Sequence, residues 1–170
     1  MFIEKLPDGL SYVVDPVEMA PELREVKDYW LAKRAGRKMP SRADINPIEL
    51  RQHLHLLFLV EVVDEAKDFR YRLLGTGVTE MLQRDSTGKT IREVYRNADP
   101  EVLQWMLDVY TAVVTRQCPV LRRGTLRVVG KEFIIFESLH LPLSDDDRRV
   151  NMIFGRARFS AHGRKAEPRP

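Results

Sequence analysis

Histidine and cysteine offer the widest range of site chemistry in this sequence, but their spacing supports little of it. His53 and His55 stand two apart, His140 and His162 lie far along the chain, and Cys118 is the only cysteine. A zinc site needs four donors, or three and a water. A single cysteine excludes an internal disulfide, and no pattern supports a catalytic Cys–His pair. We therefore predict no metal site and no catalytic residue.

Two polar segments match ligand-binding loops only in part. Thr87-Gly88-Lys89-Thr90 ends like a phosphate loop, which needs another glycine five residues before Gly88. That position holds Gln83, so we expect only a turn at Gly88. A calcium loop spaces its ligands at alternate positions, whereas residues 145–147 are three consecutive aspartates. Both segments are predicted to be solvated turns.

The basic charge of the chain is concentrated at its C-terminal end. The formal net charge is +3, and residues 156–170 carry +4, which leaves −1 for the other 155 residues. A DNA-binding domain normally carries its basic stripe on the folded body. We therefore expect residues 161–170 to be a basic flexible tail, and the charge distribution disfavours nucleic acid as a partner.

The sequence predicts a cytoplasmic protein with no membrane partner. The first residues, Met1 to Lys5, lack the basic start and apolar run of a signal peptide. The longest apolar segment, 54–63, is far shorter than the ~20 residues that span a bilayer, and it contains His55 and Glu61. One unpaired cysteine suits a reducing compartment.

Helical periodicity predicts two main helices in the chain. One spans 22–35, and its apolar face is made by Leu23, Val26, Tyr29 and Trp30. The other spans 99–117, with Asp99 as its cap and Pro100 in its first turn. Short helical pieces are expected at 48–53, 78–82 and 91–95.

Runs rich in Val, Ile, Leu and Phe predict the strands. They cover 56–63, 69–73, 120–129, 132–141 and 150–159, with a further short strand at 12–14 in an otherwise irregular lead-in. Short loops between consecutive strands imply antiparallel pairing. The prediction is an α+β domain with a five-stranded antiparallel sheet, helices on one face and an N-terminal flanking helix. We divide the chain into a lead-in at 1–19, the domain at 20–160 and the tail at 161–170.

This order of elements, together with a set of short motifs, resembles a bacterial family of single-domain proteins built on a divergent PAS domain of the PAS_5 type. The resemblance covers roughly residues 25–160. Its motifs are Tyr29-Trp30, Gly36, residues 40–47, residues 69–73, Gly75-Thr76, Asp85, residues 87–89, Glu137, Leu139 and Pro142-Leu143. It implies a PAS fold and a sensory or signalling module that binds a small ligand, a protein partner or both, without catalysis.

In a PAS fold, helices cover a small cavity on the sheet, and ligand pockets are mostly apolar with a few polar groups. The residues that we predict to line such a cavity are Tyr71, Thr76, Met81, Trp105, Phe136 and His140. On the strand 132–141, Phe136, Ser138 and His140 share one face. The sequence leaves open whether this face or the opposite one lines the cavity, and ordinary core packing remains the alternative for Tyr71 and Trp105.

The resemblance also guides the cofactor and partner predictions. Haem-sensing PAS domains usually carry a histidine on the long helix, and flavin photosensors carry a cysteine near the middle helices; this sequence has neither. We predict no haem and no flavin, and leave an unknown small ligand open. The apolar face of the helix 22–35 favours a homodimer through this helix, although the helix can instead close its own core. Two alternative functions are a nucleic-acid regulator that uses the tail and a small enzyme in the cavity.

Overall fold

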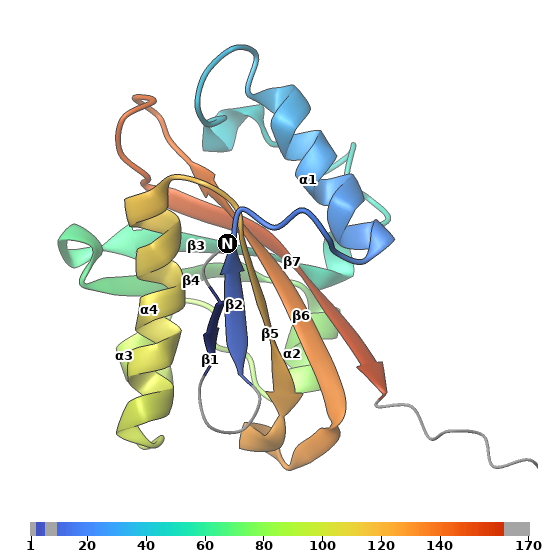
Figure 1. Cartoon of the computed structure of the whole chain (residues 1–170), viewed down its shortest axis with the longest axis vertical. Helices are drawn as coiled ribbons and strands as arrows, with labels where there is room; N and C mark the ends of the chain where they lie inside the picture. Colours follow the sequence, from blue (N-terminus) through green and yellow to red (C-terminus); the bar gives the residue numbers. More distant parts are fainter. Residues whose placement is uncertain (1–2, 6–9, 162–170) are drawn as a thin grey trace, which may run out of the picture.

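One antiparallel sheet forms the centre of the molecule (Figure 1). The computed structural model describes residues 3–5 and 10–161. The strand order across the sheet is β1-β2-β5-β6-β7-β3-β4. The strands are β1 (Ile3–Lys5), β2 (Ser11–Val14), β3 (Leu57–Val63), β4 (Asp68–Leu74), β5 (Val120–Leu126), β6 (Lys131–Leu143) and β7 (Met152–Ala161).

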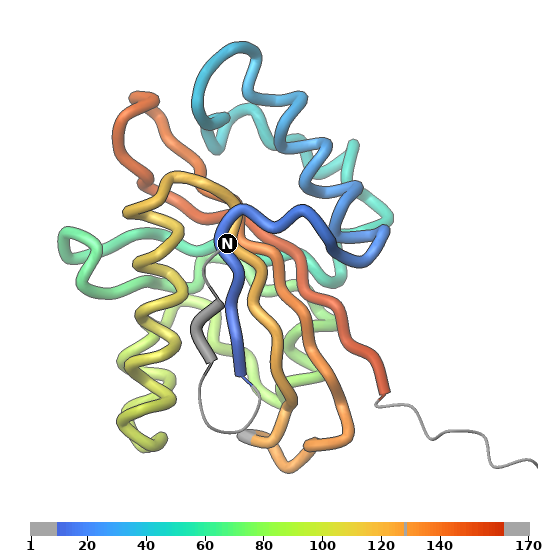
Figure 2. Tube along the Cα trace, in the orientation of Figure 1, coloured from blue at the N-terminus to red at the C-terminus, as the bar shows by residue number. Residues whose placement is uncertain are grey.

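Four α-helices accompany the sheet in the described part of the chain. They are α1 (Pro21–Lys33), α2 (Thr76–Leu82), α3 (Ile91–Val94) and α4 (Pro100–Arg116). Three of them, α2 to α4, lie in the chain between β4 and β5, as the trace in Figure 2 shows. The predicted α+β class, the antiparallel sheet and the two main helices are confirmed.

The predicted strand count of five is wrong, because the lead-in adds two strands to the sheet. The short strand expected at 12–14 is β2, and it pairs with β5 in the register Tyr12↔Arg122. Strand β1 pairs with β2 in turn. Without them β5 would be an edge strand with unpaired backbone groups, which a sheet usually covers. Residues 3–5 and 11–14 of the predicted lead-in therefore lie in the sheet, whereas the predicted tail beyond Ala161 lies outside the described residues.

The helix expected at 48–53 is also wrong. This segment is a series of turns followed by a 3₁₀ helix at Leu54–Leu56. Its backbone bonds join residues three apart, as from the amide of His53 to the carbonyl of Leu50 at 2.8 Å. Such bonds make turns and 3₁₀ helices, whereas an α-helix needs bonds between residues four apart.

Helix α4 covers one face of the sheet and begins and ends where the sequence predicts. The Asp99 side chain accepts a hydrogen bond from the Glu101 amide at 2.9 Å, and Pro100 occupies the first turn. Gln117 takes a left-handed conformation, with φ of 52°, and ends the helix. The residues that α4 buries are Trp105, Met106, Leu107, Val109, Tyr110 and Val113.

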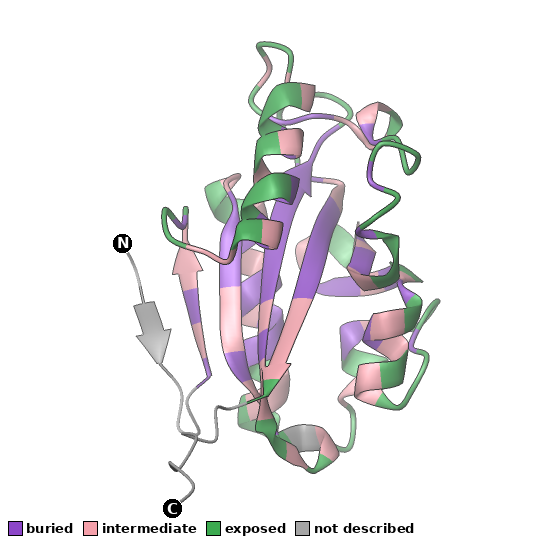
Figure 3. Ribbon diagram, turned by 90° about the vertical axis from the view of Figure 1, so that its right-hand side faces the viewer, coloured by how far each residue is buried: buried purple, intermediate pink, exposed green. Residues whose placement is uncertain are grey.

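Helix α1 packs against β6 and β7 on the opposite face of the sheet. Its apolar residues Leu23 and Val26 are fully buried, and the indole of Trp30 donates a hydrogen bond to the Pro142 carbonyl at 2.8 Å. Figure 3 shows the long strands buried along most of their length and the outer side of α1 exposed. The apolar face of α1 is thus covered by its own sheet, so it gives no reason for a second copy of the chain.

Because Trp30 packs α1 onto the sheet, its removal should lower the stability of the fold strongly. Trp30→Ala removes a buried indole and leaves the Pro142 carbonyl without its donor, so we expect the free energy of unfolding to fall by about 3–5 kcal/mol. The neighbouring Leu31 is 41% exposed, and Leu31→Ala should change it by less than about 0.5 kcal/mol. Urea unfolding measures both values. Equal effects of the two substitutions would contradict this placement of α1.

Candidate functional site

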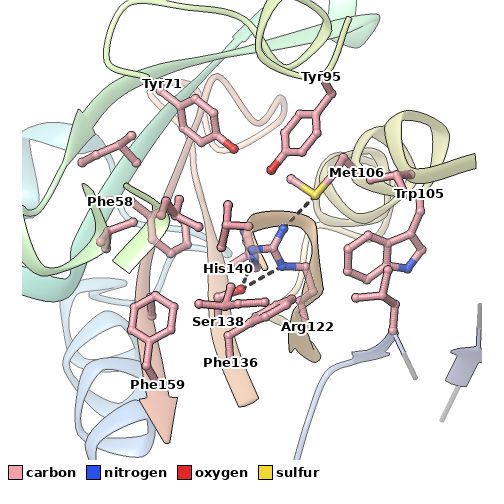
Figure 4. A pocket seen from close by; sticks show the side chains of 18 of the residues that line it. Phe58, Tyr71, Tyr95, Trp105, Met106, Arg122, Phe136, Ser138, His140 and Phe159 are labelled. Carbon is pink, nitrogen blue, oxygen red and sulfur yellow. Dashed lines mark hydrogen bonds between the residues drawn. The ribbon is translucent and has the colours of Figure 1, made fainter. Parts of the chain in front are cut away.

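A cavity of about 90 Å³ lies between α4, the short helices and the sheet. Its wall is mostly apolar and aromatic (Figure 4). The lining residues are Leu10, Phe58, Tyr71, Leu74, Val78, Leu82, Arg84, Tyr95, Val102, Trp105, Met106, Tyr110, Arg122, Thr125, Leu126, Val129, Phe136, Ser138, His140, Ala157 and Phe159. Ligand pockets commonly combine such a wall with a few placed polar groups.

The period of two along β6 brings three of these side chains to the cavity. Phe136, Ser138 and His140 alternate with Glu137 and Leu139, which face α1. The sequence left the choice between the two faces open, and the structure settles it. The same register aligns Arg122 of β5 with Ser138.

Two glycines leave space for the aromatic wall. A Cβ at Gly155 on β7 would lie 2.2 Å from the Phe58 ring, and a Cβ at Gly124 on β5 would lie 3.0 Å from the Phe136 ring. A Cβ at Gly155 would also lie 2.2 Å from the Leu139 carbonyl oxygen, and a Cβ at Gly124 would lie 2.3 Å from Leu10 Cδ2, so a larger residue at either position would force its neighbours to shift. These glycines therefore allow the Phe58 and Phe136 rings to approach the backbone of β7 and β5 closely.

A polar chain crosses the cavity floor from Arg122 to His140. The Nε of Arg122 donates to the Ser138 hydroxyl at 3.0 Å, and this hydroxyl lies 3.1 Å from His140 Nε2. The Nη1 of Arg122 donates to the Met106 sulfur at 2.9 Å. The guanidinium also lies over two rings, with its Cζ 4.7 Å from the Phe136 centroid and 5.6 Å from that of Trp105.

His140 is only 1% exposed and is held between two rings. Its centroid lies 5.0 Å from that of Phe58 and 5.1 Å from that of Tyr110, which meets it edge-on. Burial, and then the nearby positive charge of Arg122, lower the pKa of His140 well below its usual value, so the imidazole is neutral. Its Nδ1 is buried and has no hydrogen-bond partner among the described residues.

Tyrosine hydroxyls line the cavity opposite the polar chain. Figure 4 shows the hydroxyls of Tyr71 and Tyr95 pointing toward one another. Burial raises the pKa of Tyr71 well above its usual value and also raises the pKa of Tyr110, so both stay protonated. These groups are hydrogen-bond donors at every physiological pH.

The structure places four of the six predicted site residues on the cavity: Tyr71, Trp105, Phe136 and His140. Thr76 does not line it, because it is exposed at the start of α2. Met81 does not line it either; it packs against the core from α2, and its carbonyl accepts a hydrogen bond from Lys131. Val78 and Leu82 line the cavity instead, because residues four apart share one face of a helix with about 3.6 residues per turn.

Sequence reasoning missed Arg122, the charged group of the polar chain at the cavity floor. It lies in the run Leu121-Arg122-Arg123, and two consecutive arginines are equally typical of a strand end that is exposed to solvent. Alternation along β5 would have separated the two arginines onto opposite faces, but only the pairing with β6 shows which of them faces the cavity. Tyr95 and Tyr110 were missed because helical spacing alone does not separate core from cavity wall.

No group of three or more potential ligands for a metal ion occurs within the part of the chain that the structure describes. The same residues contain no helix with both the length and the apolar character needed to cross a membrane.

One comparison with known protein families agrees with this architecture. The family model PAS_5, described as a PAS domain, matches residues 19–157. No curated protein matches the chain. Among solved structures, the chain is similar to an RNA-binding light-oxygen-voltage receptor, with a TM-score of 0.49 and 14% sequence identity. The similarity covers 89% of this chain and 39% of that receptor's chain.

The buried neutral His140 predicts a pH dependence of stability. Because its pKa is lower in the folded than in the unfolded chain, the unfolded state takes up the proton first, so stability is lost as the pH falls below the usual histidine pKa of about 6.5. Uptake of one proton by the unfolded chain alone lowers the free energy of unfolding by at most about 1.4 kcal/mol per pH unit. Urea unfolding between about pH 7 and pH 5 should show a shallower loss for His140→Gln than for the unmodified chain.

His53 also has a pKa lowered by burial and by Arg156, and it contributes its own slope in both proteins. The difference between the two slopes therefore isolates His140. Parallel slopes over this range would show that His140 takes up its proton in the folded state.

Proposed function

The chain belongs to the PAS_5 family of PAS domains, and we propose that it is a sensory or signalling module whose cavity binds a small ligand. The resemblance expected from the sequence is confirmed, and so is the PAS-like fold. The single observation that supports ligand binding is the aromatic cavity with an unsatisfied buried nitrogen, His140 Nδ1, at its floor. Fully packed cores seldom leave a buried donor without a partner.

The output of such a module is proposed to be a contact with another protein. The cavity lies on one face of β6, and α1 lies on the other. The outer side of α1 is exposed and available to a signalling protein or to a second copy of the chain. The homodimer stays a prediction. Light scattering measures the mass of the full chain in solution, and a monomer at high micromolar concentration would contradict the prediction.

We propose no catalysis in the cavity. Ser138 and His140 lie at the distance of a nucleophile and its base. A working pair needs a third group that orients the base, and His140 Nδ1 has no partner among the described residues. Burial also makes this imidazole a poor proton acceptor. Labelling of Ser138 by a serine-reactive fluorophosphonate would contradict this assignment.

The size of the cavity supports the expectation that neither haem nor flavin binds here. Pockets for larger ligands measure about 300–1,000 Å³, against about 90 Å³ here. Helix α4 carries no histidine that could bind haem iron.

We therefore predict that the purified protein shows no absorbance band at roughly 400–450 nm, where tightly held haem or flavin absorbs. Absorption spectroscopy after gel filtration checks this. A band that stays with the protein would show that the cavity opens far beyond its present volume.

Filling the cavity should remove ligand binding while the fold remains. Ala157 is buried on β7 and lines the cavity. Three added carbons of Ala157→Leu fit into a space of about 90 Å³, so we expect a cost below about 3 kcal/mol. Two-dimensional NMR with a small fragment library should show shifts of cavity resonances in the unmodified chain and none in the variant.

Ala161→Leu is the matched control, because Ala161 is exposed at the end of the same strand. It should bind every fragment as the unmodified chain does. Fragments that bind Ala157→Leu with unchanged affinity would place the ligand site outside this cavity.

A further inference from the structure

We infer that the ligand of this cavity is a small carboxylate with a short apolar tail, bound through Arg122. The inference rests on the proposed function and names its ligand class. It depends on three features of the cavity: an arginine without an acidic partner, a surplus of hydrogen-bond donors, and a small apolar volume.

Arg122 and Arg123 are neighbours on β5 with opposite surroundings. Arg123 faces outward and pairs with Glu137, with 2.7 Å between its Nε and the carboxylate. Arg122 has only a hydroxyl, a sulfur and two ring faces around it, and no carboxylate of the described residues lies within 4.0 Å of it. Charges that leave bulk water are normally paired. A bound anion would supply the missing partner.

The lining of the cavity contains no aspartate and no glutamate among the residues that the structure describes, but it contains a second arginine. Arg84 lies over the Tyr95 ring, with 5.2 Å between its Cζ and the centroid. Arg84 is also exposed, so the cavity reaches the surface beside it. Two positive charges at the mouth and the floor make the field attractive to anions along the whole path.

Hydrogen-bond donors also outnumber acceptors in the cavity. Because Arg122 donates to the Ser138 hydroxyl, this hydroxyl can donate onward to His140 Nε2. That arrangement places the imidazole proton on Nδ1, the buried atom that lacks a partner. The second terminal nitrogen of Arg122, Nη2, has no partner among the described residues either. A carboxylate accepts hydrogen bonds only and complements such a set.

The volume limits the tail of the acid. A cavity that holds benzene measures about 150 Å³, whereas this one measures about 90 Å³. The apolar wall favours a tail of a few carbons over a second polar group. We therefore place short-chain monocarboxylates, with butyrate as the probe, ahead of inorganic anions and of long-chain acids.

The test compares butyrate with butyramide, which has the same shape and no charge. Two-dimensional NMR titrations at constant ionic strength give a dissociation constant for each probe and locate the site. We expect the unmodified chain to bind butyrate at least about 10-fold more tightly than butyramide, because charge-assisted hydrogen bonds are the strong ones. Inorganic phosphate should cause no shifts of cavity resonances.

Arg122→Gln should weaken butyrate binding by about 10- to 100-fold and leave butyramide binding within about 2-fold. The matched control is Arg123→Gln, one residue along on the opposite face of β5, which should leave both affinities within about 2-fold. If Arg122→Gln fails to fold, the unmodified chain alone tests the carboxylate assignment. Butyrate binding at least about 10-fold tighter than butyramide binding supports the assignment, and equal affinities contradict it.

The outcomes separate this inference from the proposed function. Equal affinities for butyrate and butyramide would overturn the carboxylate assignment and leave a cavity for neutral ligands. Phosphate binding as tight as that of butyrate would also overturn it, since the apolar tail would then contribute nothing. If neither probe nor any library fragment shifts a cavity resonance, the proposed function itself fails.

Discussion

Strand β6 has both of its faces covered, and the rest of the structure follows from this constraint. Helix α1 lies on one face and the cavity, roofed by α4, on the other. Residues of β6 that alternate along the strand therefore meet two separate environments, and a polar residue on either face needs a partner close by. Leu139 and Leu141 are fully buried and need no hydrogen-bond partner, because their side chains are apolar. Glu137, Ser138 and His140 carry polar side chains, and each of them needs a partner close by.

The two faces solve this problem in opposite ways. On the face toward α1, the Glu137 carboxylate binds two arginines, at 2.7 Å from Arg123 and 3.0 Å from Arg158, and Arg158 continues to Glu22 of α1 at 2.8 Å. Charges there alternate and are balanced. On the cavity face, the chain of Arg122, Ser138 and His140 contains no negative charge and ends at a nitrogen without a partner.

The sequence predicted the elements better than the site, for physical reasons. Periodicity located the long helix, its cap at Asp99 and the strands of the sheet, because these depend on neighbours in the chain. The pairing of β2 with β5 and the side of β5 that faces inward depend on contacts between distant segments. Tyr71, Trp105, Phe136 and His140 were named as candidate lining residues without a choice of face, and the structure places them on the cavity. Arg122 became visible only through its register with Ser138.

The same register ties the cavity to the exposed helix. Arg122 pairs across the ladder with Ser138, and the next residues, Arg123 and Glu137, pair with each other on the opposite face. Glu137 is linked to α1 through Arg158. One step along β5 and β6 therefore separates the group proposed to hold the ligand from the ion pairs that hold α1. A sheet transmits small shifts of its strands to both faces, because close-packed interiors have little room to absorb them. This ladder therefore joins the cavity to α1 through two neighbouring residue pairs and the ion pairs of Arg158.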